Sequence, residues 1–318
     1  MALASVQAVP HARPILRLAV IFAALIPLAL SSAPAVPGAI TPAGAAPPPA
    51  RPRPEPKPRW ETLPLPPEMP KAATSGRVAA AGGAEIYYAT FGKVGAPPVI
   101  LLHGGLGNGD HYAHQVPALA ERFHVIAIDS RGQGRSTLGK SKLSYAAMAS
   151  DVVAVMKELK LEKASVAGWS DGGAVALALA IAHPARVDRL FVFATNYDAK
   201  GSKPRGGNAP TFTQYSAKCR ADMAKLGKKG AFDAAAAALA PVWREPASFT
   251  KDQLRSIKAR ALIGDGDRDE IIELAQIKEM ATLIPNAQLL VLEGTSHFAL
   301  WQDPVAYTKA LLDFLTAP

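Results

Sequence analysis

The chain of 318 residues contains a single cysteine, Cys219. One thiol excludes an internal disulfide framework, a cysteine-based zinc cluster and an iron–sulfur site. Charged residues make up only 19% of the chain and aromatic residues 7%, whereas 49% of the chain is hydrophobic. Intrinsic disorder requires low hydrophobicity and a high density of charge, so most of the chain is expected to fold. The net charge is +9, but the basic excess beyond residue 70 is small and unclustered, which argues against nucleic acid as a partner.

The uncharged apolar run near the N-terminus, residues 18–30, is shorter than the roughly 20 residues that a membrane-spanning helix needs. It follows His11, Arg13 and Arg17 and precedes small residues, an arrangement typical of a cleaved secretory signal. Residues 1–33 are therefore predicted to be a signal peptide. The protein is expected to be exported, periplasmic or secreted, without stable membrane insertion after cleavage; an uncleaved N-terminal anchor is the alternative.

Proline is concentrated between residues 34 and 70, which hold 14 of the 28 prolines. Because proline lacks a backbone donor and favours an extended polyproline conformation, this stretch is predicted to be a disordered linker. The functional domain is predicted to span residues 71–318.

Short apolar runs alternate with helical patterns along this domain. The predicted strands span residues 84–91, 98–102, 123–128, 164–167, 190–194, 260–263 and 288–292. The predicted helices span residues 144–159, 174–183, 271–283 and 305–315. This alternation predicts an α/β fold with a mostly parallel sheet, helices on both faces and its chemistry at the carboxyl ends of the strands. Residues 197–256 interrupt the alternation and are predicted to form a helical cap.

Residues 168–172, with the sequence GWSDG, match the pattern G-x-S-x-G directly after a predicted strand. A serine on a sharp strand-to-helix turn needs small neighbours, which the two glycines supply. The N-terminus of the following helix adds partial positive charge near a developing oxyanion. Ser170 is therefore the predicted nucleophile.

A serine hydroxyl is too weak an acid to attack a carbonyl without a base. The chain has seven histidines, and His297 follows the last predicted strand, downstream of Ser170. None of the other histidines follows the serine at a late strand end, so His297 is the predicted base.

The base needs a carboxylate that orients its ring. Three aspartates follow the strand predicted at residues 260–263. Asp267 is preferred because it lies furthest into the turn without entering the next helix. Asp265 is the second candidate, Asp269 is interpreted as the cap of the following helix, and Asp198 is an outside candidate.

A glycine-rich loop, residues 103–107, follows the strand at residues 98–102. Such a loop lets backbone N–H groups approach a negative oxygen closely. The predicted oxyanion donors are the amides of Gly105 and Asp171, with Leu106 as the fallback, while His103 is expected to hold the loop through hydrogen bonds. Three side chains are predicted to border the substrate pocket: Leu106, Trp169 and Phe298.

Two further patterns are interpreted as chance matches. Residues 134–141 fit the phosphate-loop pattern G-x-x-x-x-G-K-S, but a phosphate loop starts at a strand end and runs directly into a helix, which begins here only near Ser144. Asp265, Asp267 and Asp269 alternate as in a calcium loop, but Glu270 stands at the sixth position, where glycine is required, and Gln276 stands where the loop needs glutamate. Neither a metal nor a cofactor is predicted.

Together, these motifs resemble the α/β-hydrolase superfamily over about residues 77–318. The resemblance rests on residues 103–105, residues 129–136, the elbow at residues 168–173, and the late Asp267 and His297. It implies an eight-stranded sheet, a cap between strands six and seven, and no cofactor. The elbow is similar to that of small carboxylesterases and biphenyl-hydrolase-like esterases, with haloperoxidase-like and lactonase-like members close by.

The predicted function is therefore that of a serine hydrolase that cleaves a small carboxylic ester, or a related acyl compound, through an acyl-enzyme. Hydrolysis of a lactone or of a carbon–carbon bond by the same triad is the main alternative. A ligand-binding protein with negligible turnover and a nucleotide hydrolase that uses Lys140 are the alternatives from other classes.

Overall fold

The computed structural model describes residues 56–318 except 228–229 and 245–248. The predicted signal peptide and most of the predicted linker lie outside the described residues. Glu55–Pro318 forms one compact unit. Within the described residues of this unit, no helix is both long enough and apolar enough to span a membrane.

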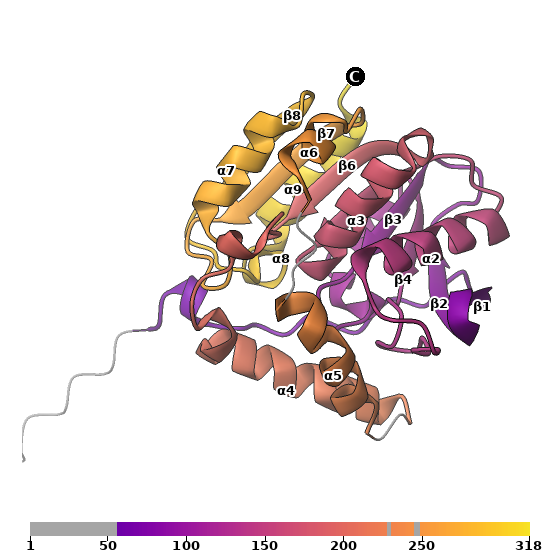
Figure 1. Ribbon diagram of the computed structural model, residues 1–318, viewed down its shortest axis with the longest axis horizontal. Helices are drawn as coiled ribbons and strands as arrows, with labels where there is room; N and C mark the ends of the chain where they lie inside the picture. The colour runs from indigo at the N-terminus through magenta and orange to yellow at the C-terminus, as the bar shows by residue number, and fades with distance from the viewer. Residues whose placement is uncertain (1–55, 228–229, 245–248) are drawn as a thin grey trace, which may run out of the picture. The chain divides into compact units, whose positions relative to one another are not determined.

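An eight-stranded sheet in the order β1-β2-β4-β3-β5-β6-β7-β8 forms the centre of this unit (Figure 1). The strands are β1 (Thr74–Ala80), β2 (Ala84–Phe91), β3 (Pro98–Leu102), β4 (His124–Ile128), β5 (Ala164–Trp169), β6 (Val187–Phe193), β7 (Arg260–Gly266) and β8 (Ala287–Leu292). β2 pairs antiparallel with both β1 and β4, whereas every pair from β4 to β8 is parallel. The predicted fold class is confirmed.

The helices in the described residues follow the predicted alternation. They are α1 (Val116–Ala120), α2 (Tyr145–Glu158), α3 (Asp171–Ala182), α4 (Pro210–Lys225), α5 (Ala231–Arg244), α6 (Lys251–Arg255), α7 (Leu274–Leu283), α8 (Ala299–Gln302) and α9 (Pro304–Thr316). The Ser144 side chain accepts a hydrogen bond from the Ala147 N–H and begins α2 where the sequence predicts its cap.

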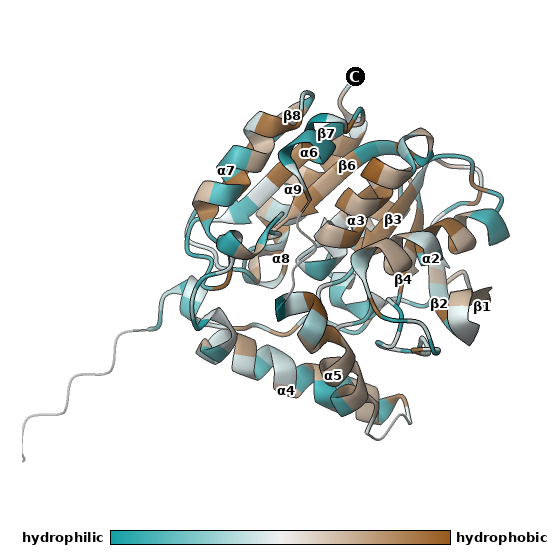
Figure 2. Cartoon of the chain, viewed as in Figure 1, coloured by the Kyte–Doolittle hydropathy of each residue, from teal (hydrophilic) through white to brown (hydrophobic). Residues whose placement is uncertain are grey.

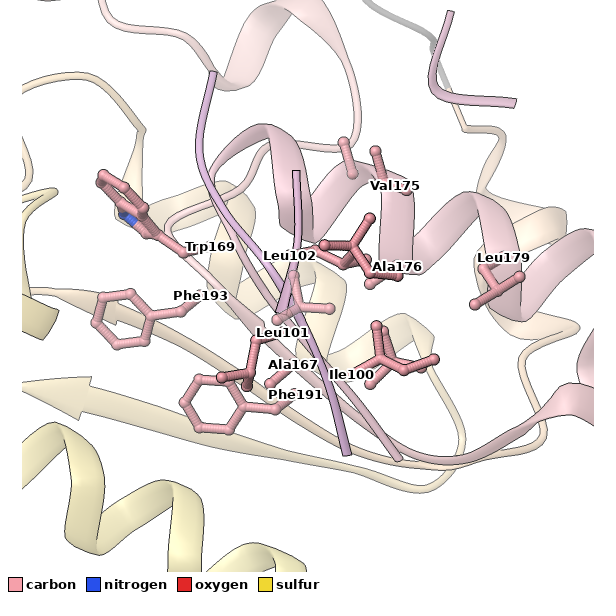
Figure 3. Close-up of a cluster of buried hydrophobic side chains, with 14 of the residues drawn as sticks. Ile100, Leu101, Leu102, Ala167, Trp169, Val175, Ala176, Leu179, Phe191 and Phe193 are labelled. Atoms are coloured by element: carbon pink, nitrogen blue, oxygen red, sulfur yellow. The ribbon is translucent and has the colours of Figure 1, made fainter. Parts of the chain in front are cut away.

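Helices pack on both faces of the sheet, which explains why the central strands are continuous apolar runs. Val175 and Leu179 of α3 lie on the same side of the strands as Ile100, and Phe191 points to the other side (Figure 3). There the Phe191 ring meets Tyr307 of α9 edge to face, with 5.4 Å between the ring centroids. α3 consists mainly of hydrophobic residues, as expected of a buried helix, whereas α4 and α7 mix hydrophobic and hydrophilic residues (Figure 2).

The insertion between β6 and β7 forms the predicted helical cap, with α4 and α5 side by side (Figure 1). The buried face of α4 carries Tyr215, Cys219 and Met223. Burial raises the pKa of the Cys219 thiol to about 12, so this cysteine is an inert packing residue.

The predicted linker is too long at its C-terminal end, because residues 59–62 already bind the domain. The Arg59 guanidinium donates to Asp303 at 2.5 Å and to the Gly294 carbonyl at 3.1 Å. The Gln302 amide donates to the Thr62 carbonyl at 2.8 Å. This N-terminal arm, residues 59–62, therefore contacts the loop that follows β8.

Candidate active site

The turn between β5 and α3 holds Ser170 in a backbone conformation that few non-glycine residues adopt, with φ 56° and ψ −124°. The turn is tight on both sides of the serine. A Cβ atom at Gly168 would overlap the Gly172 carbonyl, and one at Gly172 would overlap the Leu102 carbonyl. Only glycine fits at these two positions, as the sequence pattern predicts.

His297 lies in the loop between β8 and α8, and its ring reaches Ser170. The distance from Ser170 Oγ to His297 Nε2 is 2.9 Å. The loop is fixed from the side of the elbow, because the Trp169 indole N–H donates to the His297 carbonyl at 2.8 Å. This contact depends on the packing of β5 against the loop, and no local sequence pattern indicates it.

The carboxylate beside His297 belongs to Asp269, and the predicted choice of Asp267 is wrong. Asp269 Oδ2 lies 2.8 Å from His297 Nδ1. Asp269 Oδ1 accepts hydrogen bonds from the N–H groups of Ile271 at 2.6 Å and Ile272 at 2.8 Å. Asp269 Oδ1 thus holds the loop that precedes α7, and the expected role of Asp269 as a helix cap is wrong, because α7 begins only at Leu274, after Glu273.

Asp267 instead stabilises the loop that precedes His297. Its Oδ1 accepts a hydrogen bond from the Gly294 N–H at 2.7 Å, and its side chain is 28% exposed. The other candidates also lie away from the ring: Asp265 is buried beside Asp269, and Asp198 accepts from the Gln276 amide at 2.7 Å. The physical reason for the error is that β7 continues to Gly266, so the turn begins later than the sequence suggests.

Burial and charge act in opposite directions on this pair. Burial works to lower the pKa of His297, but the charge and hydrogen bond of Asp269 outweigh it, and the pKa is raised. Burial works to raise the pKa of Asp269, but the same contact with His297 holds that pKa below its ordinary value. An ionised Asp269 fixes the ring proton on Nδ1, which leaves Nε2 free to accept the Ser170 proton.

The loop that follows β3 lies against the elbow. A Cβ atom at Gly104 would stand 3.2 Å from the Ser170 Cβ. His103 holds this loop as expected: its Nε2 accepts from the Ser130 N–H at 2.9 Å, so its Nδ1 donates to the Gly104 carbonyl at 2.7 Å. Burial lowers the pKa of His103 to about 4, which keeps the ring neutral.

The Asp171 N–H lies in the first turn of α3, where the helix provides no acceptor for it. The roles of the Gly105 and Asp171 amides in oxyanion binding stay a prediction.

Ser170 and His297 open into a cavity of about 310 Å³ between the sheet edge and the cap. Of the predicted pocket residues, Trp169 and Phe298 line this cavity. Leu106 does not line the cavity, because its side chain packs in the hydrophobic core. Its backbone has a positive φ of 68°. The cap supplies further walls that the sequence did not reveal: Phe212, Tyr215 and Trp243.

The cavity also contains the carboxyl group of Asp171, the residue after the nucleophile. The Tyr145 hydroxyl donates to it at 2.8 Å, and the Trp243 indole N–H of the cap donates to it at 2.9 Å. Burial raises the pKa of Asp171, although both donors act in the other direction. Asp171 thus connects the elbow to α5, and Tyr215 connects the neighbouring loop to α4 by donating to the Gly105 carbonyl at 2.8 Å.

The two patterns interpreted as chance matches take other structural roles. Residues 134–141 do not run directly into a helix, since α2 begins at Tyr145, and Asp129 accepts from the Arg135 N–H at 2.7 Å. Asp267 faces the Gly294 N–H, whereas Asp265 and Asp269 are buried together, so the three carboxyl groups do not surround a common point. Among residues 56–318, apart from the two short gaps, no group of three or more acidic, histidine or cysteine side chains could hold a metal ion.

Comparison with known proteins agrees with this geometry. A family model described as the alpha/beta hydrolase fold matches residues 97–222. A putative carbamate hydrolase, RutD of a Caulobacter species, is 30% identical over 242 residues, which cover 68% of this chain and 90% of that protein. The chain belongs to the α/β-hydrolase family.

Solved structures show the same architecture with different activities. The enol-lactonase from Burkholderia xenovorans matches with a TM-score of 0.64 and 25% identity over 76% of this chain and all of that chain. The carboxylesterase CesB from Bacillus subtilis matches with a TM-score of 0.62 over 79% of this chain and 94% of that chain, and at 21% identity it supports the fold alone. The protein is thus a hydrolase of the α/β fold, and the bond that it cleaves is a separate question.

Proposed function

We propose that this protein is a serine hydrolase that cleaves small carboxylic esters, or related acyl compounds, through an acyl-enzyme. The observation that carries the proposal is the continuous hydrogen-bonded chain from Ser170 through His297 to Asp269 at the wall of the cavity. This arrangement has the distances that proton transfer from a nucleophile to a base requires.

In the proposed reaction, Ser170 Oγ attacks the acyl carbonyl while His297 Nε2 takes the hydroxyl proton. The amides of Gly105 and Asp171 hold the negative oxygen of the tetrahedral intermediate. His297 then delivers the proton to the leaving alcohol, which departs and leaves the acyl group on Ser170. A water molecule, deprotonated by His297, releases the acid. Asp269 keeps the imidazole oriented and stabilises its charged form in both halves of the reaction.

The cavity supports a small and largely apolar substrate. Its volume of about 310 Å³ lies at the lower end of the range for small-molecule pockets. The aromatic walls favour an apolar acyl or alcohol group, and the Asp171 carboxyl disfavours an anionic group beside the elbow.

A lactone is the second candidate substrate, because the similarity to an enol-lactonase reaches 25% identity over the whole of that enzyme. A carbamate is the third, since RutD is a putative carbamate hydrolase. Carbon–carbon bond hydrolysis by the same residues belongs to the same test. A panel of p-nitrophenyl esters, lactones, carbamates and β-diketones of increasing size would rank these classes by kcat/KM.

The test of the proposal is a pair of serine variants assayed with p-nitrophenyl acetate. Ser170→Ala should lower kcat by several orders of magnitude. Ser202→Ala is the matched control, because Ser202 also lines the cavity but lies outside the hydrogen-bonded chain. Near-native turnover of the Ser170→Ala protein would refute the proposal, and labelling by a fluorophosphonate without repeated turnover would favour a ligand-binding protein.

Export through residues 1–33 is a separate part of the proposal, tested by mapping the mature N-terminus after expression.

A further inference from the structure

A second carboxyl group, which the mechanism above does not use, lies behind Asp269. Asp265 stands near the end of β7 and has no exposed surface. Its Oδ1 accepts a hydrogen bond from the Gly266 N–H at 2.8 Å. Its Oδ2 is buried and receives no hydrogen bond from a donor group among the described residues. A buried carboxyl oxygen without a donor is costly, unless it carries a proton that it can donate itself.

The acceptor for such a proton is the carboxyl group of Asp269, because the side chains of Asp265 and Asp269 are within hydrogen-bond contact. Two buried carboxyl groups in contact cannot both be ionised at moderate cost, so one of them holds a proton. Asp269 accepts from His297 and from two backbone N–H groups, whereas Asp265 accepts from one. The donors therefore stabilise the negative charge on Asp269 and leave the proton on Asp265.

The remaining charges around the pair do not reverse this assignment. Lys203 donates to the Asp269 carbonyl at 2.5 Å, and its charge lowers the pKa of Asp265. Burial and the charge of Asp269 both act more strongly, so the pKa of Asp265 is raised well above its ordinary value. The carboxyl groups of Glu270 and Asp171 also raise the pKa of His297 and so add to the effect of Asp269.

We propose that Asp265 is a positioning residue of this site: as a neutral carboxylic acid, it donates a hydrogen bond from Oδ2 to the Asp269 carboxylate. The site then consists of four side chains in series, Ser170, His297, Asp269 and Asp265. The donated bond holds Asp269 with one oxygen toward His297 and withdraws part of its negative charge. It thereby limits how far Asp269 raises the basicity of the imidazole. This inference rests on the proposed function only where it concerns catalysis, since the protonation of Asp265 can be measured without any substrate.

Two variants separate a neutral Asp265 from an ionised one. In Asp265→Asn, the amide can still donate to Asp269 and its oxygen can still accept from Gly266, so the hydrogen bonds of a neutral acid are kept. In Asp265→Leu, a side chain of similar size can do neither. The readout is the pH at which the rate of Ser170 labelling by a fluorophosphonate is half-maximal on its acid side, since this midpoint reports the pKa of His297.

The midpoint of the Asp265→Asn protein should stay within about a third of a pH unit of the wild type. The midpoint of the Asp265→Leu protein should rise by about one unit, because Asp269 without its donor becomes a stronger base and stabilises the imidazolium more. If Asp265 were ionised, the Asn variant would remove a negative charge near His297 and its midpoint would fall. A fall in the Asn variant, or equal shifts in both variants, overturns the proposal.

Infrared spectroscopy tests the proton directly and does not depend on how the Leu variant folds. The wild-type protein should show a carbonyl stretching band of a protonated carboxyl group at pH 7–8, and Asp265→Asn should lack this band. A wild-type spectrum without the band, or a band that persists in the Asn variant, overturns the assignment. If Ser170 resists the fluorophosphonate while the band behaves as expected, the proposed function fails and the protonated Asp265 stands.

Discussion

Exchange of each of two neighbouring aspartates for asparagine distinguishes the acid that the structure places at His297 from the one that the sequence favours. Asp269→Asn should severely impair catalysis, whereas Asp267→Asn should not. Both substitutions keep the size of the side chain and remove one negative charge, so each variant is a control for the other.

The expected loss at Asp269 follows from its hydrogen bonds. The carboxylate accepts from His297 on one oxygen and from the N–H groups of Ile271 and Ile272 on the other. An amide has one oxygen, so it can serve only one side. If the oxygen faces the two isoleucine amides, the NH₂ group faces His297 Nδ1 and forces the ring proton onto Nε2, which then cannot take the proton of Ser170. The expected fall in kcat is about 10³–10⁴-fold, or about 4–5.5 kcal/mol of transition-state stabilisation.

Asp267 makes one backbone hydrogen bond, to the Gly294 N–H, and an exposed pair with Arg268 at 3.4 Å. An asparagine oxygen can still accept from Gly294, and an exposed ion pair contributes less than about 1 kcal/mol. The Asp267→Asn protein should therefore retain kcat within about threefold. Both proteins are assayed with p-nitrophenyl acetate after circular dichroism has shown that they are folded. Equal losses in the two variants, or a larger loss for Asp267→Asn, would refute the assignment of the orienting acid to Asp269.

Three further predictions concern the surroundings of the site. Because the pKa of His297 is raised and the base must be neutral, kcat/KM should fall on the acid side with a midpoint above the ordinary histidine value of about 6.5, and a pH–rate profile with a midpoint below that value contradicts the assignment. Tyr215→Phe removes the hydroxyl that holds the Gly105 carbonyl, so kcat should fall about tenfold with little change in KM, whereas a change confined to KM would make Tyr215 only a pocket wall. Arg59→Ala in the full chain should lower the free energy of unfolding by about 1 kcal/mol, seen as a fall in Tm of about 2–4 °C in thermal unfolding, and an unchanged Tm would show that the N-terminal arm adds no stability.

The parts of the fold that were predictable from the sequence are those with local signals. Strands buried on both faces are continuous apolar runs, and the bounds of β2 and β3 match the prediction to the residue. The meeting of Ser170 and His297 was predictable because Ser170 directly follows β5 and His297 lies in the loop after β8, and the strand ends of a parallel sheet meet at one edge. β1 was missed because it is a largely exposed edge strand without an apolar run.

Contacts between distant parts of the chain were not predictable. Trp243 and Tyr215 reach the site only because the cap docks over the elbow, and the sequence of the cap contains no pattern that specifies this docking. The N-terminal arm was hidden in the same way, since the prolines on either side of it indicate an extended chain whether or not that chain is bound. In both cases, the decisive information is the surface against which the segment packs.

The choice among the three aspartates shows where local reasoning about this site reaches its limit. Glycine weakens a strand, so the sequence favours an end to β7 before Gly264. In the sheet, β7 continues to Gly266, which pairs with Leu292 of β8, and Gly264 fits because a Cβ there would press on the Phe193 ring and the Leu290 Cβ. The pairing with β8 therefore decides where β7 ends. This pairing moves the turn along the chain by a few residues, turns Asp265 into the interior and brings Asp269 to His297, so the same glycines that obscured the acid also place the two carboxyl groups side by side.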